Sequence, residues 1–229
     1  MMSKIKGVLF ALYFLITVAI LIALMYIFKS KNRELRRSWC KYSLKLFGIK
    51  IVIEGKRDRE AKFLMLNHQS MLDILVLEAI EADNLCWIAK KEIAKVPLYG
   101  HILKAPKMIE LDRANKRGLI KLLSDVKERL ADNRVIAIFP EGTRGDGKKL
   151  LKFKDGSKMI ANKFNLKVQP IVVFNTIKGL DSKKLKQSSA TVTIKYLDSK
   201  LADKKSDWYR DIEKEMREVY ESTNSLSNR

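Results

Sequence analysis

An uncharged run near the start of the chain constrains the fold more than any other feature. Residues 7–28, GVLFALYFLITVAILIALMYIF, contain no charged side chain. As a helix rising about 1.5 Å per residue, this run would extend about 33 Å, enough to cross a hydrocarbon core of about 30 Å. A cleaved signal peptide would have a shorter apolar stretch and a cleavage site with small residues. The sequence therefore predicts a retained membrane anchor.

The basic segment that follows, residues 29–48, predicts a second helix. Its apolar side chains recur at helical spacing between lysines and arginines: Leu35, Trp39, Tyr42 and Leu46. This pattern is typical of an amphipathic helix at a membrane interface, although an ordinary packed helix would share it. Basic loops remain on the cytoplasmic side of a membrane. We therefore predict a membrane-associated helical pair over residues 1–47, either spanning the bilayer or forming a hairpin in one leaflet.

The overall composition favours a folded protein with an anionic partner. The net charge is +20, while 47% of the residues are hydrophobic, which is enough for a core and excludes a disordered chain. The lysines are spread along the chain without a nucleic-acid-binding signature, so we expect no nucleic acid partner. The two cysteines and two histidines form no cluster in sequence, so we expect no metal site.

Beyond residue 48, strand-like and helical segments alternate. The predicted strands are 49–53, 63–66, 84–89, 108–111, 135–139, 168–174 and 190–197. The predicted helices are a segment beginning near Ser70, then 116–133, 155–164 and 206–222. Strands separated by helices indicate an α/β domain over residues 48–229, built on a mixed, mostly parallel sheet flanked by helices.

One histidine stands at a junction between a strand and a helix, in NHQSMLD at residues 67–73. Five helical steps would place His68 and Asp73 on different faces of one helix. If the chain instead turns at 67–69 and the helix begins with Ser70 as its N-cap, the carboxylate points back toward the imidazole. The same Ser70-x-x-Asp73 spacing is that of a capping box, which only stabilises a helix start.

A second polar segment, FPEGTRGDG at residues 139–147, follows another predicted strand. Its glycines would let backbone N–H groups approach an anion, and Arg144 could hold a phosphate with two donors. Arg113, at the end of ELDR, also follows a strand. Residues just past the strand ends of an open α/β sheet gather in one crevice. We therefore expect His68, Arg113 and Arg144 to lie near one another.

These blocks identify a family that the sequence resembles. NHQSMLD matches the N-H-x₄-D motif of the lysophosphatidate (PlsC-like) acyltransferases, and ELDR, FPEGTRGDG and VQPIVV follow in that family's order. AKKEIAKVPLYG and FKDG resemble its intervening segments, so the resemblance covers roughly residues 1–197. The sequence departs from the family pattern at Leu111, where an aromatic residue or isoleucine is frequent.

The resemblance implies transfer of a fatty acyl group from a thioester to the free hydroxyl of 1-acylglycerol 3-phosphate, giving phosphatidate. His68 would be the general base and Asp73 would orient its ring. The substrate hydroxyl is itself the nucleophile, and the chain has no G-x-S-x-G elbow. The residues expected to bind the acceptor are Arg113, Glu141, Gly142, Thr143, Arg144 and Lys154. Glu141 could either orient Arg144 or bind the glycerol, and the groups that stabilise the oxyanion are not assigned.

The expected partners are membrane phospholipid, lysophosphatidate, and an acyl carrier protein or coenzyme A thioester as donor, with no further cofactor. The catalytic domain would face the cytoplasm at the inner membrane. Two alternatives are consistent with the sequence. The acceptor could be glycerol 3-phosphate or another lysolipid, since the same arginines would hold any phosphate. The chain could also be a non-catalytic, membrane-tethered basic binding module.

Overall fold

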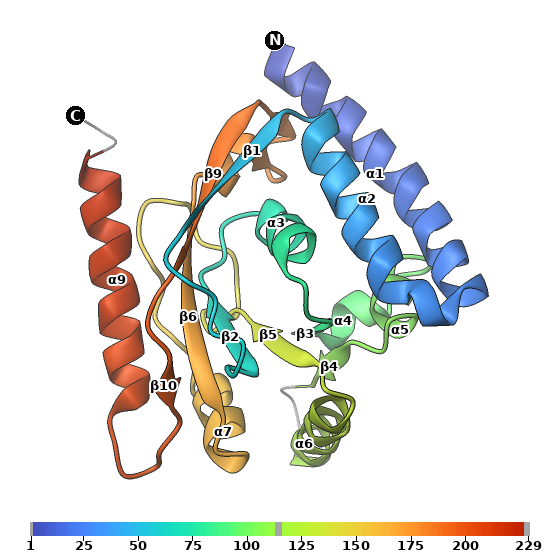
Figure 1. The fold of residues 1–229 in the computed structure, drawn as a ribbon. Coiled ribbons are helices and arrows are strands. Elements are labelled where there is room, and N and C mark those ends of the chain that lie inside the picture. The colour runs from blue at the N-terminus through green and yellow to red at the C-terminus, as the bar shows by residue number, and fades with distance from the viewer. Residues whose placement is uncertain (1, 113–115, 227–229) are drawn as a thin grey trace.

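The protein is built around one twisted sheet with helices on both faces (Figure 1). The computed structural model describes residues 2–112 and 116–226. The strands of this sheet are β1 (Ile49–Glu54), β2 (Phe63–Leu66), β3 (Leu85–Lys90), β4 (Ile109–Leu111), β5 (Val135–Ile138), β6 (Lys167–Phe174), β9 (Ala190–Tyr196) and β10 (Lys200–Leu201). A small hairpin, β7 (Leu180–Asp181) with β8 (Lys186–Gln187), lies apart from it.

The strand order is β1-β9-β6-β2-β5-β3-β4, with β10 paired to β6. The β9–β6 and β10–β6 pairs are antiparallel, and the other pairs in this sheet are parallel. The predicted mixed, mostly parallel sheet is therefore confirmed. Because β2 lies between β5 and β6, its carboxyl end is close to the carboxyl ends of both neighbours. Segments that follow β2 and β5 can thus meet in one crevice at the carboxyl ends of the strands.

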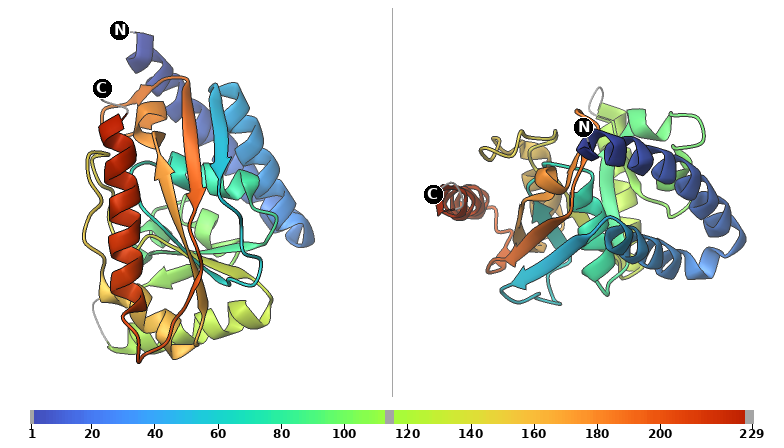
Figure 2. Two further views of the ribbon diagram at one scale, coloured as in Figure 1. Left: turned by 60° about the vertical axis from the view of Figure 1, so that its left-hand side comes forward. Right: turned by 90° about the horizontal axis from the view of Figure 1, so that it is seen from above.

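The longer helices cover the two faces of this sheet. They are α1 (Met2–Ile27), α2 (Asn32–Leu46), α3 (Leu72–Ile80), α6 (Lys116–Ala131), α7 (Asp155–Lys163) and α9 (Trp208–Leu226). Shorter helices, which the sequence pattern did not predict, are η1 (Lys29–Lys31), α4 (Lys91–Ala94), α5 (His101–Lys104) and α8 (Thr176–Gly179). Figure 2 shows α9 on one side of the sheet and the α1–α2 pair on the other.

Alternate strand residues build a separate core on each face, as the period of two requires. Phe63 and Met65 of β2 pack in the core beneath α6, α7 and α9. Leu64 and Leu66 pack in the core beneath α1, α2 and α3. All four side chains are fully buried, so β2 is a central strand covered on both sides.

Helix α1 buries one side and exposes an apolar side along its length. Its window of highest hydropathy is only 28% buried, and it is long and apolar enough to cross a membrane. Its exposed apolar side chains include Ile5, Leu9, Leu12, Ile16, Ile20 and Ile27. A water-soluble surface rarely carries so long an apolar stripe. The exposed side of α1 can therefore contact lipid while its buried side stays packed against the rest of the protein.

Helix α2 forms as predicted, but it turns a polar face inward. Arg36 and Cys40 are buried against α3, whereas Tyr42 and Leu46 of the predicted apolar stripe are 62% and 52% exposed. Arg36 donates to the buried carboxylate of Glu78 on α3 at 2.5 Å. This ion pair explains why a basic face can be buried. The boundary between the anchor and the domain at residues 47 and 48 stays a prediction, because α2 packs on α3 of the following segment.

Candidate active site

The turn after β2 carries the histidine and is held in place by its first residue. The Asn67 amide continues the pattern of the sheet beyond the end of β2. Its Nδ2 donates to the Val173 carbonyl at 2.9 Å, and its Oδ1 accepts the Val173 N–H at 2.7 Å. Asn67 is 1% exposed, so this pairing also satisfies groups that burial would otherwise leave unbonded. The position at which the chain leaves β2 and enters the histidine turn is therefore fixed by this pair of hydrogen bonds.

The carboxylate of Asp73 organises the turn from the first turn of α3. Its Oδ2 accepts the N–H groups of Gln69 at 2.7 Å and Ser70 at 2.9 Å, and its Oδ1 accepts the Thr176 hydroxyl. Ser70 Oγ accepts the Leu72 N–H at 3.2 Å, but α3 begins at Leu72 with Met71 as its N-cap, so the predicted N-cap at Ser70 is one residue early. The capping function and the histidine contact use the same carboxylate.

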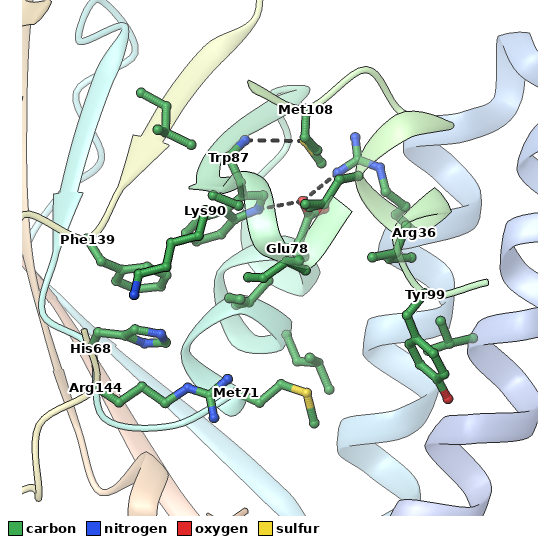
Figure 3. Close-up of a pocket in the computed structure, with 18 of the residues that line it drawn as sticks. Arg36, His68, Met71, Glu78, Trp87, Lys90, Tyr99, Met108, Phe139 and Arg144 are labelled. Carbon is green, nitrogen blue, oxygen red and sulfur yellow. Dashed lines mark hydrogen bonds and ion pairs between the residues drawn. The ribbon is translucent and has the colours of Figure 1, made fainter. Parts of the chain in front are cut away.

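His68 and Asp73 come together in the way that the helix start allows. His68 Nδ1 lies 2.7 Å from Asp73 Oδ2. A carboxylate at this position can accept a hydrogen bond from Nδ1, an arrangement that leaves the lone pair of Nε2 available as an acceptor. The imidazole also stacks on Phe139, with ring centroids 3.8 Å apart. Its remaining exposed edge faces a cavity, as Figure 3 shows.

Glu141 is not at the cavity surface, where the resemblance placed it. It is 2% exposed, and its two oxygens accept backbone N–H groups, from His68 at 2.6 Å and from Leu151 at 2.8 Å. In the described structure it neither contacts Arg144 nor lines the cavity. Its carboxylate therefore joins the histidine turn to the glycine-containing loop, and its predicted contact with the acceptor stays a prediction.

The loop that follows β5 brings three of the predicted residues to the cavity. Gly142, Thr143 and Arg144 all line it together with His68. Arg144 is exposed, and its Nη1 has one contact, with Ser182 Oγ at 3.3 Å. In Figure 3 its guanidinium lies on the same side of the cavity as the His68 ring. A cationic group is thus available beside the imidazole.

Of the remaining predicted residues, one does not line the cavity and one lies outside the described residues. Lys154 precedes α7; its side chain is exposed and does not line the cavity. Its backbone carbonyl instead accepts the Tyr209 hydroxyl at 2.6 Å. Arg113 lies outside the described residues, so its expected position near His68 stays a prediction.

The cavity itself has a volume of about 590 Å³ and is mostly apolar. It extends from His68 between α1, α2 and α3, and its apolar lining includes Phe14, Val18, Leu21, Trp39, Leu75 and Ile102. Arg36 and Glu78, which are paired with each other, also border it. Sequence reasoning missed Lys90, which lines the cavity from the end of β3 (Figure 3). Its position just past a strand end was the signal that could have revealed it.

The second histidine, His101, lies outside this constellation. Its Nδ1 is 2.6 Å from the Tyr26 hydroxyl, and the two rings pack edge to face. This contact joins α5 to α1. His101 is therefore a structural contact in the described structure, in agreement with the absence of an acidic residue near it in sequence.

The Glu141 carboxylate predicts a pH dependence of stability. Burial raises its pKa from 4.5 to about 7, against the lowering effect of the His68 and Leu151 N–H donors. Between these two values the folded protein holds a proton that the unfolded chain releases, so stability contributed by this group is present below pH 4.5 and lost as the pH rises through 7. Glu141→Gln removes this titration.

We expect the wild-type melting temperature to fall relative to that of Glu141→Gln as the pH rises from 4.5 to 8. Thermal unfolding across this range measures the difference. Glu218→Gln, at an exposed position on α9, serves as the matched control and should run parallel to the wild type. A constant difference between wild type and Glu141→Gln would contradict the assigned protonation.

Comparison with known proteins supports one chemistry for this site. The Acyltransferase family model matches residues 48–174, which include the histidine turn and the glycine-containing loop. A curated 1-acyl-sn-glycerol-3-phosphate acyltransferase from Helicobacter pylori is 42% identical over 92% of both chains. A lyso-ornithine lipid O-acyltransferase from Rhizobium meliloti is 30% identical over 65% of this chain and 50% of its own.

The fold has a close counterpart among solved structures. The crystal structure of the 1-acyl-sn-glycerophosphate acyltransferase PlsC from Thermotoga maritima covers 99% of this chain, and the match spans 98% of that protein. The TM-score is 0.74 at 26% sequence identity. The matched family model, the Helicobacter relative and the shared fold show that this chain is an acyltransferase and belongs to the PlsC-like, lysophosphatidate acyltransferase family.

Proposed function

We propose that the protein transfers a fatty acyl group from an acyl thioester to the sn-2 hydroxyl of 1-acyl-sn-glycerol 3-phosphate, giving phosphatidate. The observation that carries this proposal is the apolar cavity lined by His68, whose Nδ1 is bonded to Asp73, with Arg144 beside it. An apolar cavity suits a fatty chain, and a guanidinium suits a phosphate monoester. The name of the Helicobacter relative specifies the same acceptor.

The reaction follows from the position of the imidazole. As the sn-2 oxygen attacks the thioester carbonyl carbon, Nε2 of His68 takes the hydroxyl proton. The tetrahedral intermediate then expels the thiol sulfur, which receives that proton, so the new C–O bond replaces the C–S bond. Asp73 holds the ring and stabilises the imidazolium between these steps. Positioned base catalysis of this kind contributes about 10²–10⁴ in rate.

Substrate binding divides between the rim and the interior of the cavity. Arg144 and Lys90 supply positive charge for the acceptor phosphate, and the apolar residues between α1, α2 and α3 supply a lining for an acyl chain. The donor is a thioester of acyl carrier protein or coenzyme A. Both donors are anionic, and a net charge of +20 favours their approach from solution.

The proposed location is the cytoplasmic face of the inner membrane. The exposed apolar side of α1 would lie in the lipid, and the basic residues of 29–48 would lie against anionic headgroups. Lysophosphatidate and phosphatidate remain in the bilayer, whereas the thioester donors are soluble. An active site at the membrane surface reaches both.

The test of this function is acyl transfer by purified protein to a panel of acceptors. We expect turnover with 1-acylglycerol 3-phosphate to exceed turnover with glycerol 3-phosphate and with lyso-ornithine lipid. His68→Ala should lower turnover by about 10²–10⁴ while the melting temperature stays near that of the wild type. His101→Ala is the matched control and should keep turnover. Absence of transfer to 1-acylglycerol 3-phosphate by the wild type would exclude this function.

The role of Arg144 has a separate test. Arg144→Ala should raise the KM for the acceptor by about tenfold to a hundredfold, because a charge-assisted hydrogen bond is worth about 1.5–3 kcal/mol. The KM for the thioester donor should stay unchanged. Arg210→Ala, which removes an exposed arginine from α9, controls for the loss of one positive charge. An unchanged acceptor KM would refute the phosphate contact.

The contact of α1 with lipid is tested by placing charge on its exposed side. Leu12 and Ile16 are 51% and 59% exposed, so Leu12→Glu with Ile16→Glu should leave the fold intact. Each buried charge in lipid is costly, and the double variant should shift from the membrane fraction to the soluble fraction. Ile120→Glu, on α6, is the control and should stay with membranes. A double variant that pellets like the wild type would show that other surfaces bind lipid.

A further inference from the structure

The C-terminal helix reaches the active site through one hydroxyl. Tyr220 of α9 is 2% exposed, and its ring stacks on Phe174 with centroids 5.5 Å apart. Its hydroxyl accepts from Gln69 Nε2 at 2.6 Å and donates to the Gly147 carbonyl at 2.7 Å. A tyrosine hydroxyl can accept and donate at once, whereas phenylalanine can do neither. Tyr220 therefore joins two segments that are 78 positions apart in the chain.

These two segments are the ones that carry the proposed chemistry. Gln69 directly follows His68, and Gly147 ends the loop that presents Arg144 to the cavity. Gln69 is fixed on its other side, since its N–H donates to Asp73 and its Nε2 also donates to the Val173 carbonyl at 3.1 Å. The Tyr220 hydroxyl thus fixes the loop relative to a turn that is already rigid.

Two other contacts join the same turn and loop, and both act through the backbone of His68. Its N–H donates to Glu141, and its carbonyl accepts the Gly145 N–H at 2.8 Å. The Gly145 N–H lies one residue beyond Arg144, and neither contact reaches Gly147, where the loop ends. Gly147 has a φ of +81°, and an added Cβ there would meet Ile177 at 2.8 Å. The backbone at this end of the loop is therefore packed closely against Ile177. Tyr220 supplies its hydrogen bond.

We propose that Tyr220 is a positioning residue for acyl transfer: its hydroxyl sets the distance between the His68 turn and the Arg144 loop. The residue lies outside the segment 48–174 that matches the family model, so the family motifs do not assign it. An acceptor must present its phosphate to Arg144 and its hydroxyl to His68 Nε2 at the same time. A loop that drifts by a fraction of an ångström would uncouple these two contacts.

The test compares two tyrosines of the same helix. Tyr220→Phe removes only the bridging hydroxyl. Tyr209→Phe is the matched control, because the Tyr209 hydroxyl is also buried and bridges two groups. It lies 2.5 Å from Ser157 Oγ and 2.6 Å from the Lys154 carbonyl oxygen. Neither Ser157 nor Lys154 lines the cavity. We expect Tyr220→Phe to lower kcat/KM for the acceptor by about threefold to tenfold with an unchanged KM for the donor. Tyr209→Phe should keep the wild-type values while losing a similar amount of thermal stability.

A double-mutant cycle separates positioning from general destabilisation. Gln69→Met removes the partner amide at nearly constant volume. If the two residues act through their shared hydrogen bond, adding Tyr220→Phe to Gln69→Met should lower kcat/KM by less than Tyr220→Phe does alone. Fully additive losses, or an equal loss in Tyr209→Phe, would overturn the proposal.

The kinetic measurements rest on the proposed acyl transfer, so one further measurement is independent of it. Amide hydrogen exchange should accelerate within residues 142–147 in Tyr220→Phe and not in Tyr209→Phe. Unchanged exchange in this loop would refute the positioning role even if the acyltransferase activity were as proposed. Suppose that exchange is faster but the protein has no activity toward 1-acylglycerol 3-phosphate. The role of Tyr220 in holding the loop would then stand, and only the proposed acceptor would be refuted.

Discussion

The active site depends on one buried carboxylate that is used twice. Asp73 closes the N-terminal turn of α3 by accepting the N–H groups of Gln69 and Ser70, and the same oxygen holds Nδ1 of His68. A helix start leaves N–H groups without intrahelical partners and carries a partial positive charge, so an anion there is stabilised. The carboxylate that holds the turn before α3 is therefore already fixed at the point where the imidazole requires an acceptor. Distant residues complete this arrangement, since Thr176 donates to the second oxygen of Asp73 and Glu141 accepts the His68 N–H.

A second constraint is the buried ion pair that joins α2 to α3. Glu78 on α3 accepts from Arg33 and Arg36 of α2 and from the indole of Trp87, and it is 3% exposed. Removing one partner from such a buried pair leaves an uncompensated charge, which costs about 3–5 kcal/mol. Arg33 and Arg36 of α2 are thereby held against α3. The cavity is lined by residues of the two helices that these ion pairs join. The outer surface available to lipid is then the apolar side of α1.

Much of this arrangement could be predicted from local sequence, and the reason is physical. The apolar run of β2 and the H-x₄-D spacing are both short-range signals. What depended on tertiary packing could not be read. The sequence did not reveal that Glu141 accepts two backbone N–H groups, and its expected contact with the acceptor stays a prediction. Packing divides the predicted apolar stripe of residues 29–48. Leu35 and Trp39 pack against α1, whereas Tyr42 and Leu46 are exposed. Nothing in the sequence indicated that the Glu78 carboxylate on α3 would bury Arg36 of the same helix. Lys90 lies in AKKEIAKVPLYG and at a strand end, a signal that was available but not used, whereas Tyr220 lies beyond every motif, so only the fold could bring it to the site.

The site combines two environments that a lipid acceptor requires at once. An apolar cavity lowers the local dielectric and strengthens the interaction between the imidazolium and Asp73, whereas a phosphate needs cationic groups that water can also reach. The chain separates these needs by placing the histidine on a turn packed between strands and the arginine on an exposed loop. That separation makes the relative position of turn and loop the critical geometric variable. Glu141, Gly145 and Tyr220 all act on this one variable, from the near end of the loop to its far end. The proposed chemistry therefore requires rigidity at the junction of turn and loop, so that the exposed Arg144 and the partly buried His68 can act on one acceptor.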